Sequence, residues 1–228
     1  MRNAAIIVAA FVFLASFRTA RISFFDIKGL AASCTAIKSI SSLTSVNAFL
    51  SIKNFKQIIV VVPSNILKSL IAKYKTSFEC VSGGKERFDS VKNGLALVRD
   101  DIDFIAVHDA ARPLISKKDI LAVLKEAKKT KAATAVEKTK DTIKLVTNNN
   151  KILKTLNRGF LRNTQTPQIF KSTLLKKAYS KKISTNITDD SQLIENLKIK
   201  VSAVETKFPN FKVTTKQDFA LAEKLLKS

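Results

Sequence analysis

Residues 56–107 read KQIIVVVPSNILKSLIAKYKTSFECVSGGKERFDSVKNGLALVRDDIDFIAV. Apolar, strand-like runs alternate in this stretch with segments whose apolar residues recur three and four positions apart, as on one face of a helix. We expect strands at 56–63, 79–82 and 104–107, and helices at 65–75 and 90–98. Because strands that alternate with helices form βαβ units, the stretch predicts an α/β fold with a doubly wound, mostly parallel sheet.

The beginning of the chain has two interpretations. Arg2 and the apolar run from Ala4 to Ala15 resemble the charged start and hydrophobic segment of a secretory signal. A buried first strand of a parallel sheet, here residues 4–10, has the same composition. The alternation that follows favours the strand.

Later elements continue the pattern. Ser116 with Asp119, and Thr215 with Asp218, have the spacing of helix-capping pairs, and the second pair precedes an expected helix at 219–226. Short β-like runs at 139–145 and 151–156, joined by a turn at 147–150, predict a hairpin arm over about 139–158. With 228 residues and no linker-like segment, we expect one domain, 1–228, that includes this arm.

Charge is the strongest compositional signal, with a formal net charge of +22. Such a chain suits an anionic partner, but only eight of its 40 basic residues are Arg, and they are spread along the sequence. With no Trp and two Tyr, the chain also lacks a base-stacking pattern. We therefore do not expect a nucleic acid, and a compositional drift toward Lys, Ile and Asn explains the charge more simply. No apolar run is long enough to span a bilayer, so we expect no membrane partner either. The two cysteines form no metal-binding pattern, which favours a reduced, cytoplasmic compartment.

Two turns after expected strands carry groups suited to chemistry. Gly83-Gly84-Lys85-Glu86-Arg87 leads to Ser90 and the start of a helix, where glycines permit close approach of a ligand; an ordinary capped turn would have a similar sequence. His108-Asp109-Ala110-Ala111-Arg112 follows the strand at 104–107, and open sheets place ligands at this end of their strands. Asp109 can hold a metal or a hydroxyl group and Arg112 can brace it, while the lone His108 is better explained as a buried residue that orients the turn than as a base.

Six motifs, from about residue 46 to 228, occur in one order: GGKERFDSVKNGL, VHDAARP, DTIK, NRGFLRNTQTPQIF, TDDSQLIE and NFKVTTKQDFALAE. In this order and spacing they resemble the 2-C-methyl-D-erythritol 4-phosphate cytidylyltransferases of the non-mevalonate isoprenoid pathway. The ribitol-5-phosphate cytidylyltransferases share many of them. The resemblance implies a Rossmann-like nucleotidyltransferase fold and a cytidylyl transfer from CTP, with Mg²⁺ and release of pyrophosphate. It also implies a homodimer whose hairpin arm completes the partner's site.

The resemblance assigns roles residue by residue. For CTP it implies Ala9, Ala10, Gly83, Gly84, Arg87, Ser90, Asp109 and Ala110. For the methylerythritol phosphate it implies Asp109, Thr142, Arg158, Thr166, Thr188 and Lys212. Among these, Arg158 and Lys212 would be catalytic, by aiming the attacking phosphate, and Asp109 would hold the metal. Lys212 is expected in a short strand.

One segment departs from the family pattern. After Ala9-Ala10 the resemblance implies a glycine-rich phosphate loop with an Arg, but this chain has Phe11, Phe13 and Ala15 at those places. A Phe side chain does not fit a loop whose backbone must touch phosphate oxygens. Three explanations remain open: a segment read in a shifted frame, a decaying copy, or substitution by the cations at 18, 21 and 28.

The leading function is therefore cytidylyl transfer from CTP to methylerythritol phosphate. Transfer to ribitol 5-phosphate, or a catalytically inactive dimer that still binds a sugar phosphate, are the alternatives.

Overall fold

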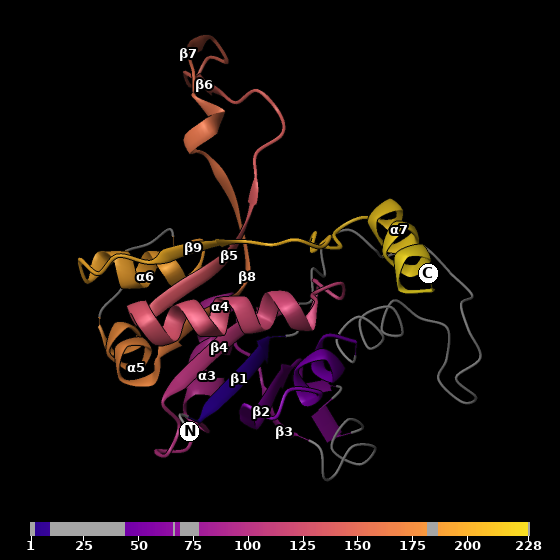
Figure 1. The fold of residues 1–228 in the computed structure, drawn as a ribbon, viewed down its shortest axis with the longest axis vertical. Helices are drawn as coiled ribbons and strands as arrows, with labels where there is room; N and C mark the ends of the chain where they lie inside the picture. Colours follow the sequence, from indigo (N-terminus) through magenta and orange to yellow (C-terminus); the bar gives the residue numbers. More distant parts are fainter. Residues whose placement is uncertain (1–2, 10–43, 66, 69–77, 182–186, 228) are drawn as a thin grey trace.

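The computed structural model describes residues 3–9, 44–65, 67–68, 78–181 and 187–227 (Figure 1). Its strands and helices are β1 (Ala4–Ala9), β2 (Phe55–Val62), β3 (Glu79–Ser82), α3 (Arg87–Leu95), β4 (Phe104–Asp109), α4 (Lys117–Thr130), β5 (Ala132–Lys138), β6 (Lys144–Val146), β7 (Ile152–Thr155), the 3-10 turn η1 (Arg158–Phe160), β8 (Arg162–Lys171), α5 (Ser172–Ser180), α6 (Asp190–Asn196), β9 (Ser202–Glu205) and α7 (Lys216–Lys227). Residues 44–50 are also helical. The expected helix at 65–75 falls mostly outside the described residues, as do Ala10, Phe11, Phe13 and Ala15.

Seven strands form one sheet in the order β3-β2-β1-β4-β8-β5-β9. Every neighbouring pair is parallel except the two pairs that include β8, which runs against both β4 and β5. The predicted doubly wound, mostly parallel sheet is thus confirmed. The apolar composition of β2, whose residues from Gln57 to Val62 are all buried, explains its place inside the sheet.

Helices cover both faces of the sheet. One core cluster packs α4 and the helix at 44–50 on one face, through residues that include Ile120, Val123 and Phe49. The second cluster packs α3, α5 and α6 on the other face, through residues that include Val91, Leu175 and Ile194. Such two-sided covering leaves the carboxyl ends of the strands as the edge where a ligand can bind.

The predicted hairpin is present as the antiparallel pair β6 and β7. It projects from the body beyond the ends of β5 and β8 (Figure 1). Several large apolar side chains on this arm are exposed, among them Ile152 at 65%, Leu153 at 61% and Phe160 at 87%. In the part of the chain described, nothing packs against these three side chains closely enough to cover them.

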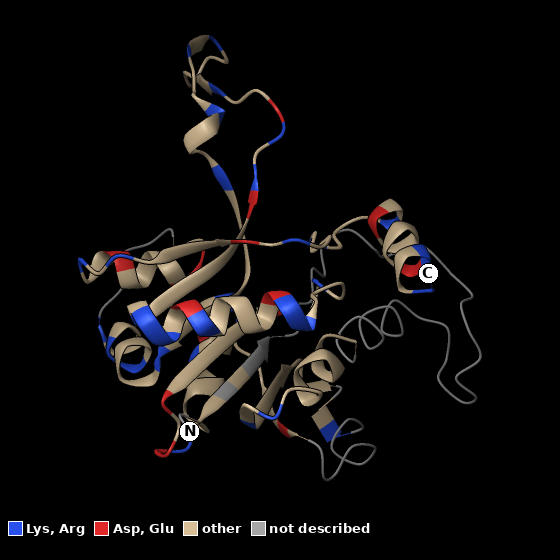
Figure 2. Cartoon of the chain, in the orientation of Figure 1, with Lys and Arg blue, Asp and Glu red and all other residues tan. Residues whose placement is uncertain are grey.

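Lys and Arg are spread over the body, the arm and α7 rather than gathered over one element (Figure 2). In the described residues, no helix is both long and apolar enough to cross a bilayer.

Candidate functional site

Asp109 lies at the carboxyl end of β4, next to the end of β1. In the parallel pair of these strands, Ala9 is in register with Asp109. Ala110, the next residue, is buried, and its carbonyl accepts a hydrogen bond from the Ser45 hydroxyl at 3.4 Å. The structure therefore brings two of the predicted nucleotide-binding positions, Ala9 and Ala110, to the same strand ends as the predicted metal ligand.

Two cations contact the Asp109 carboxylate. Arg87 Nε lies 3.3 Å from Oδ1, and Lys212 Nζ lies 3.4 Å from Oδ2. Burial of the carboxyl group opposes its ionisation, but the charges of Arg87, Lys212 and Arg112 outweigh that effect and hold its pKa below its ordinary value. Asp109 is therefore an anion at neutral pH, held between two cations at the ends of the strands.

Lys212 does not lie in a strand, contrary to the expectation. The segment 209–214 has no regular secondary structure. It is held beside the site because the Val213 amide donates to the Ala111 carbonyl at 2.8 Å. A β-strand needs a series of backbone hydrogen bonds to a neighbouring strand, and this single bond is not enough to form one. It still directs the Lys212 side chain toward Asp109.

The Arg112 guanidinium does not pair with the Asp109 carboxylate, although the sequence suggested that it would brace this group; only the Arg112 backbone amide contacts Asp109, by donating to its carbonyl at 2.9 Å. Its guanidinium donates to the carbonyls of Asn210 at 2.8 Å and Thr164 at 3.4 Å. Arg87, which comes from another βα turn, takes the bracing position. Arg112 instead ties the segment that carries Lys212 to the end of β8.

The loop Gly83–Gly84 packs tightly on the first turn of α3. A Cβ atom at Gly84 would lie 2.2 Å from Asp89 Cβ, and one at Gly83 would lie 2.9 Å from Ser90 Oγ. The Ser90 hydroxyl closes the loop, because it accepts from the Gly84 amide and donates to the Glu86 carbonyl, both at 3.1 Å. The amide of Glu86 donates to the Asp89 carboxylate, which caps the helix. The glycines are thus required by the shape of the loop, next to Arg87.

His108 is fully buried and orients the turn, as expected. The Asp109 amide donates to Thr166 Oγ1. The Arg112 carbonyl can only accept, so His108 Nε2–H donates to it, and Nδ1 of the neutral ring accepts from the Thr166 hydroxyl. Burial lowers the pKa of His108 to about 4 despite the neighbouring Asp109 charge. The imidazole is therefore neutral at pH 7. Thr166 is also buried, and the single proton of its hydroxyl group is used in the hydrogen bond to His108 Nδ1.

His108 makes the stability of the fold depend on pH. The unfolded chain binds a proton near the ordinary pKa of 6.5, whereas the folded chain does so only at about 4. The stability that this shift contributes is present above pH 6.5 and is lost as the pH falls toward 4. We expect the free energy of unfolding in urea to fall by about 2 kcal/mol more in the wild type than in His108→Gln between about pH 7.5 and about pH 5. Equal falls in the two proteins would contradict this account.

Three predicted substrate-binding residues lie away from Asp109 or have only local contacts. Arg158 is exposed on the arm, where its guanidinium donates to the Lys140 carbonyl at 2.6 Å. Thr142 is exposed on the same arm. Thr188 is exposed beside α6, and its amide donates to the Gln192 side chain at 2.9 Å. Within one chain, the structure gathers Arg87, Asp109, Thr166 and Lys212 into contact, and leaves the two arm residues outside that cluster.

Sequence reasoning missed Asp190, to which it gave no role beyond membership of the TDDSQLIE motif. Asp190 is fully buried and forms an ion pair with Arg87 at 2.5 Å. The neighbouring Asp189 does cap α6, by accepting from the Gln192 amide. One signal in the sequence could have pointed to Asp190. The TDDS motif has two adjacent acids, and a helix N-cap needs only one of them, Asp189.

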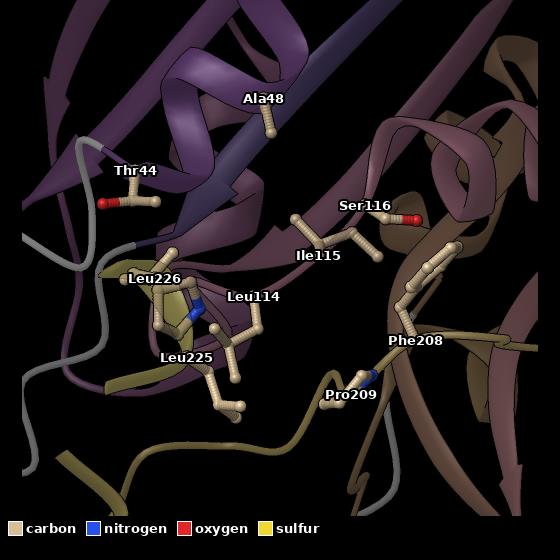
Figure 3. Close-up of a pocket in the computed structure, with 10 residues that line it drawn as sticks. Thr44, Ala48, Leu114, Ile115, Ser116, Phe208, Pro209, Leu225 and Leu226 are labelled. Carbon is tan, nitrogen blue, oxygen red and sulfur yellow. The ribbon is translucent and has the colours of Figure 1, made fainter. Parts of the chain in front are cut away.

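A separate apolar pocket of about 450 Å³ lies behind the turn that follows β4 (Figure 3). Its lining comes from the helix at 44–50, Leu114, Ile115, Phe208 and the end of α7. None of the side chains that contact Asp109 lines it. The pocket is distinct from the candidate site.

Comparisons with known proteins agree on one family. The family model described as "2-C-methyl-D-erythritol 4-phosphate cytidylyltransferase" matches residues 38–228. A protein of that name from Endomicrobium trichonymphae is 74% identical over 186 residues, which cover 82% of this chain and 85% of that protein. One from Caldanaerobacter subterraneus subsp. tengcongensis is 39% identical over 193 residues, covering 80% and 84%.

Solved structures resemble most or all of the chain. A 4-diphosphocytidyl-2C-methyl-D-erythritol synthase from Anaerococcus prevotii has a TM-score of 0.79 at 26% identity, and the match covers 100% of this chain and 99% of that one. A 2-C-methyl-D-erythritol 4-phosphate cytidylyltransferase from Thermus thermophilus has a TM-score of 0.69 at 28% identity, with 81% and 87% covered. The similarity in structure thus extends over the sheet that carries Asp109.

Proposed function

The chain belongs to the 2-C-methyl-D-erythritol 4-phosphate cytidylyltransferase family, and from this premise we propose that its Asp109 cluster is the centre where a cytidylyl group passes from CTP to 2-C-methyl-D-erythritol 4-phosphate. The reaction serves the synthesis of isoprenoid precursors. An oxygen of the sugar phosphate forms a bond to the α-phosphorus of CTP, the bond from that phosphorus to the β-phosphate bridging oxygen breaks, and pyrophosphate leaves.

The observation that carries the assignment is the placement of Arg87 and Lys212 on the two oxygens of Asp109 at the strand ends. Phosphoryl-type transfers depend on positioning and charge neutralisation rather than on a covalent intermediate. Arg87 and Lys212, held in place at the carboxyl ends of the strands, would supply both the positioning and the neutralising charge. The buried, neutral His108 takes no part as a base, because a phosphate monoester attacks as an anion.

We assign the nucleotide end of the site to the glycine loop and the neighbouring strand ends. Gly83, Gly84 and Ser90 would recognise the cytosine, with Arg87 supporting that loop. Ala9 and Ala110 are small residues that would leave room for the ribose and phosphates beyond the carboxyl ends of β1 and β4; Ala10, assigned with them from the resemblance, lies outside the described residues. Their support is the register of β1 with β4, which brings Ala9 beside Asp109.

At the sugar-phosphate end we assign Lys212 and Arg158 to aiming the attacking phosphate. Thr142, Thr166, Thr188 and Asp109 would bind the rest of that substrate. Lys212 is supported by its contact with Asp109. Thr166 would act through the position of its oxygen beside the Asp109 amide, since its proton is held by His108.

We propose that Mg²⁺ assists with Asp109 as its one protein carboxylate. In the described residues no group of three or more His, Cys, Asp or Glu could hold a metal ion. A site of one carboxylate plus substrate phosphates is usual for Mg²⁺, so the residues fit a metal that arrives with CTP. When bound, the ion neutralises charge on the CTP phosphates.

The arm supports a homodimer with shared sites. Because Arg158 and Thr142 lie outside the Asp109 cluster of their own chain, they would serve the cluster of a second subunit. The exposed Ile152 and Leu153 on β7 are apolar side chains that such an interface would cover. Since the reaction consumes CTP, we place the protein in the cytoplasm.

Loss of the dimer is the expected result of making the arm polar. Ile152→Ser with Leu153→Ser removes apolar area that we assign to the interface, so sedimentation velocity should show monomers where the wild type shows dimers. Leu225→Ser on α7 is the control and should leave the wild-type mass unchanged. A wild type that sediments as a monomer at about 10 μM would refute the arm assignment.

A specific observation favours one alternative. The family match begins at residue 38, after the segment in which Phe11 and Phe13 replace expected glycines. An inactive relative that binds only the sugar phosphate would have such a sequence. Pyrophosphate release from CTP should be measured with methylerythritol phosphate and with ribitol 5-phosphate. The proposal expects release with the first; release only with the second would assign the ribitol substrate, and none with either would support the inactive relative.

A further inference from the structure

Asp190 is a buried carboxylate with both oxygens occupied. It is the first residue of α6 and has no exposed surface. Oδ2 accepts a hydrogen bond from Arg87 Nη2 at 2.5 Å, and Oδ1 accepts one from the Tyr179 hydroxyl. Burying a charge is unfavourable unless it is paired and hydrogen-bonded. The protein therefore holds this acid in place by contacts from two other elements, α3 and α5.

The Arg87 guanidinium joins two acids. Its Nη2 faces Asp190, while its Nε donates to Asp109 Oδ1 at 3.3 Å. Burial opposes the charge of Arg87, but the two carboxylates together raise its pKa further above its ordinary value. A planar guanidinium has donors in fixed directions, so fixing one side of it against Asp190 sets the direction in which the other side meets Asp109.

The partners of Asp190 are themselves held. Gln168, fully buried on β8, accepts from the amides of Asp190 and Ser191, both at 3.0 Å. Tyr179 stacks on Phe88 with ring centroids 4.5 Å apart and an angle of 7° between the planes. Since Phe88 follows Arg87 in α3, this stack fixes the same helix turn that the ion pair fixes.

We propose that Asp190 is a positioning residue for the nucleotide end of the site. With Tyr179, it holds the Arg87 guanidinium against Asp109 and so keeps the Gly83–Gly84 loop in the shape that receives the cytosine. Asp190 does not touch substrate; it acts through Arg87. The proposal rests on the proposed function for the part that concerns cytosine, but its claim about Arg87 is independent of catalysis.

The first test measures Arg87 directly. In a ¹H–¹⁵N spectrum of the full chain with labelled arginine side chains, Arg87→Met identifies the Arg87 Nε–H signal by its loss. In the wild type this proton should exchange slowly with water, because it is held against Asp109. In Asp190→Asn it should exchange at least about tenfold faster. An unchanged exchange rate would overturn the proposal, whatever the activity of the chain.

The second test separates positioning from a general role in folding. Asp190→Asn should lower kcat/KM for CTP by about tenfold, mainly through KM, as expected for loss of one charge-assisted hydrogen bond. Tyr179→Phe keeps the stack on Phe88 and should have a smaller effect. The double variant Arg87→Met with Asp190→Asn should be no worse than Arg87→Met alone.

Additive losses in the double variant would show that Asp190 acts independently of Arg87 and would overturn the proposal. If the wild type releases no pyrophosphate at all, the proposed function fails. The exchange measurement then still decides whether Asp190 holds Arg87.

Discussion

Lys212→Met is expected to lower kcat for pyrophosphate release by about 100- to 1,000-fold, the size seen when one group that stabilises developing charge is removed. Lys212 contacts Asp109 Oδ2 and is the cation of the cluster that does not also bind a second acid. Met keeps the apolar stem and removes only the ammonium. Because the cytosine end of the site is untouched, KM for CTP should change by less than about threefold.

The matched control is Lys216→Met, an exposed lysine at the start of α7 that makes the same change in net charge. It should retain wild-type kcat. Thermal unfolding should be nearly the same for both variants, since the Lys212 side chain is 33% exposed and Asp109 keeps its contact with Arg87. A Lys212→Met enzyme with wild-type kcat would remove Lys212 from the catalytic assignment.

Asp109→Asn is the second large effect, with an expected loss of about 100-fold or more in kcat/KM. The amide has nearly the same shape, but it removes the one carboxylate we assign to Mg²⁺ and the charge that orders Arg87 and Lys212. Activity of the wild type should disappear with EDTA and return with Mg²⁺, whereas excess Mg²⁺ should not restore the variant.

Asp101→Asn is the control for Asp109→Asn, because Asp101 is an exposed acid paired with an exposed Arg99. It should leave kcat/KM unchanged. The depressed pKa of Asp109 also predicts that its ionisation contributes no acidic limb to the pH–rate profile above about pH 4. An Asp109→Asn enzyme with full, EDTA-sensitive activity would contradict the metal assignment.

Much of the sheet could be predicted from local pattern. The strand at Glu79–Ser82 was predicted with its observed bounds, and the strands β1, β2 and β4 within about two residues. β8 was not predicted as a strand, because its polar residues and Pro167 are typical of a turn. In the structure Pro167 lies where the register of β5 with β8 shifts, between the pairs Thr134 with Gln168 and Val136 with Thr164. The polar side chains of Gln165, Thr166 and Gln168 are buried there, and each one has a hydrogen-bond partner.

The site residues that come directly after a strand could be predicted, but the contacts between residues on distant elements could not. Asp109 and the Gly83–Gly84 loop stand directly after predicted strands, so their place at the strand ends follows from the fold class. The contact of Arg87 with Asp190 joins residues 103 positions apart, on α3 and α6. No local pattern carries that pairing. For the Asp109 carboxylate the sequence pointed to Arg112, whereas the structure pairs it with Arg87.

The most direct test of the account is a ³¹P NMR spectrum of the full chain incubated with CTP, methylerythritol phosphate and Mg²⁺. The account predicts that the phosphomonoester and CTP signals decline together, while the paired signals of a new diphosphate diester and the signal of pyrophosphate grow in equal amounts. It also predicts that Lys212→Met, folded as the wild type, slows this conversion by about 100-fold or more. A wild-type chain that binds methylerythritol phosphate but forms no diester would contradict it.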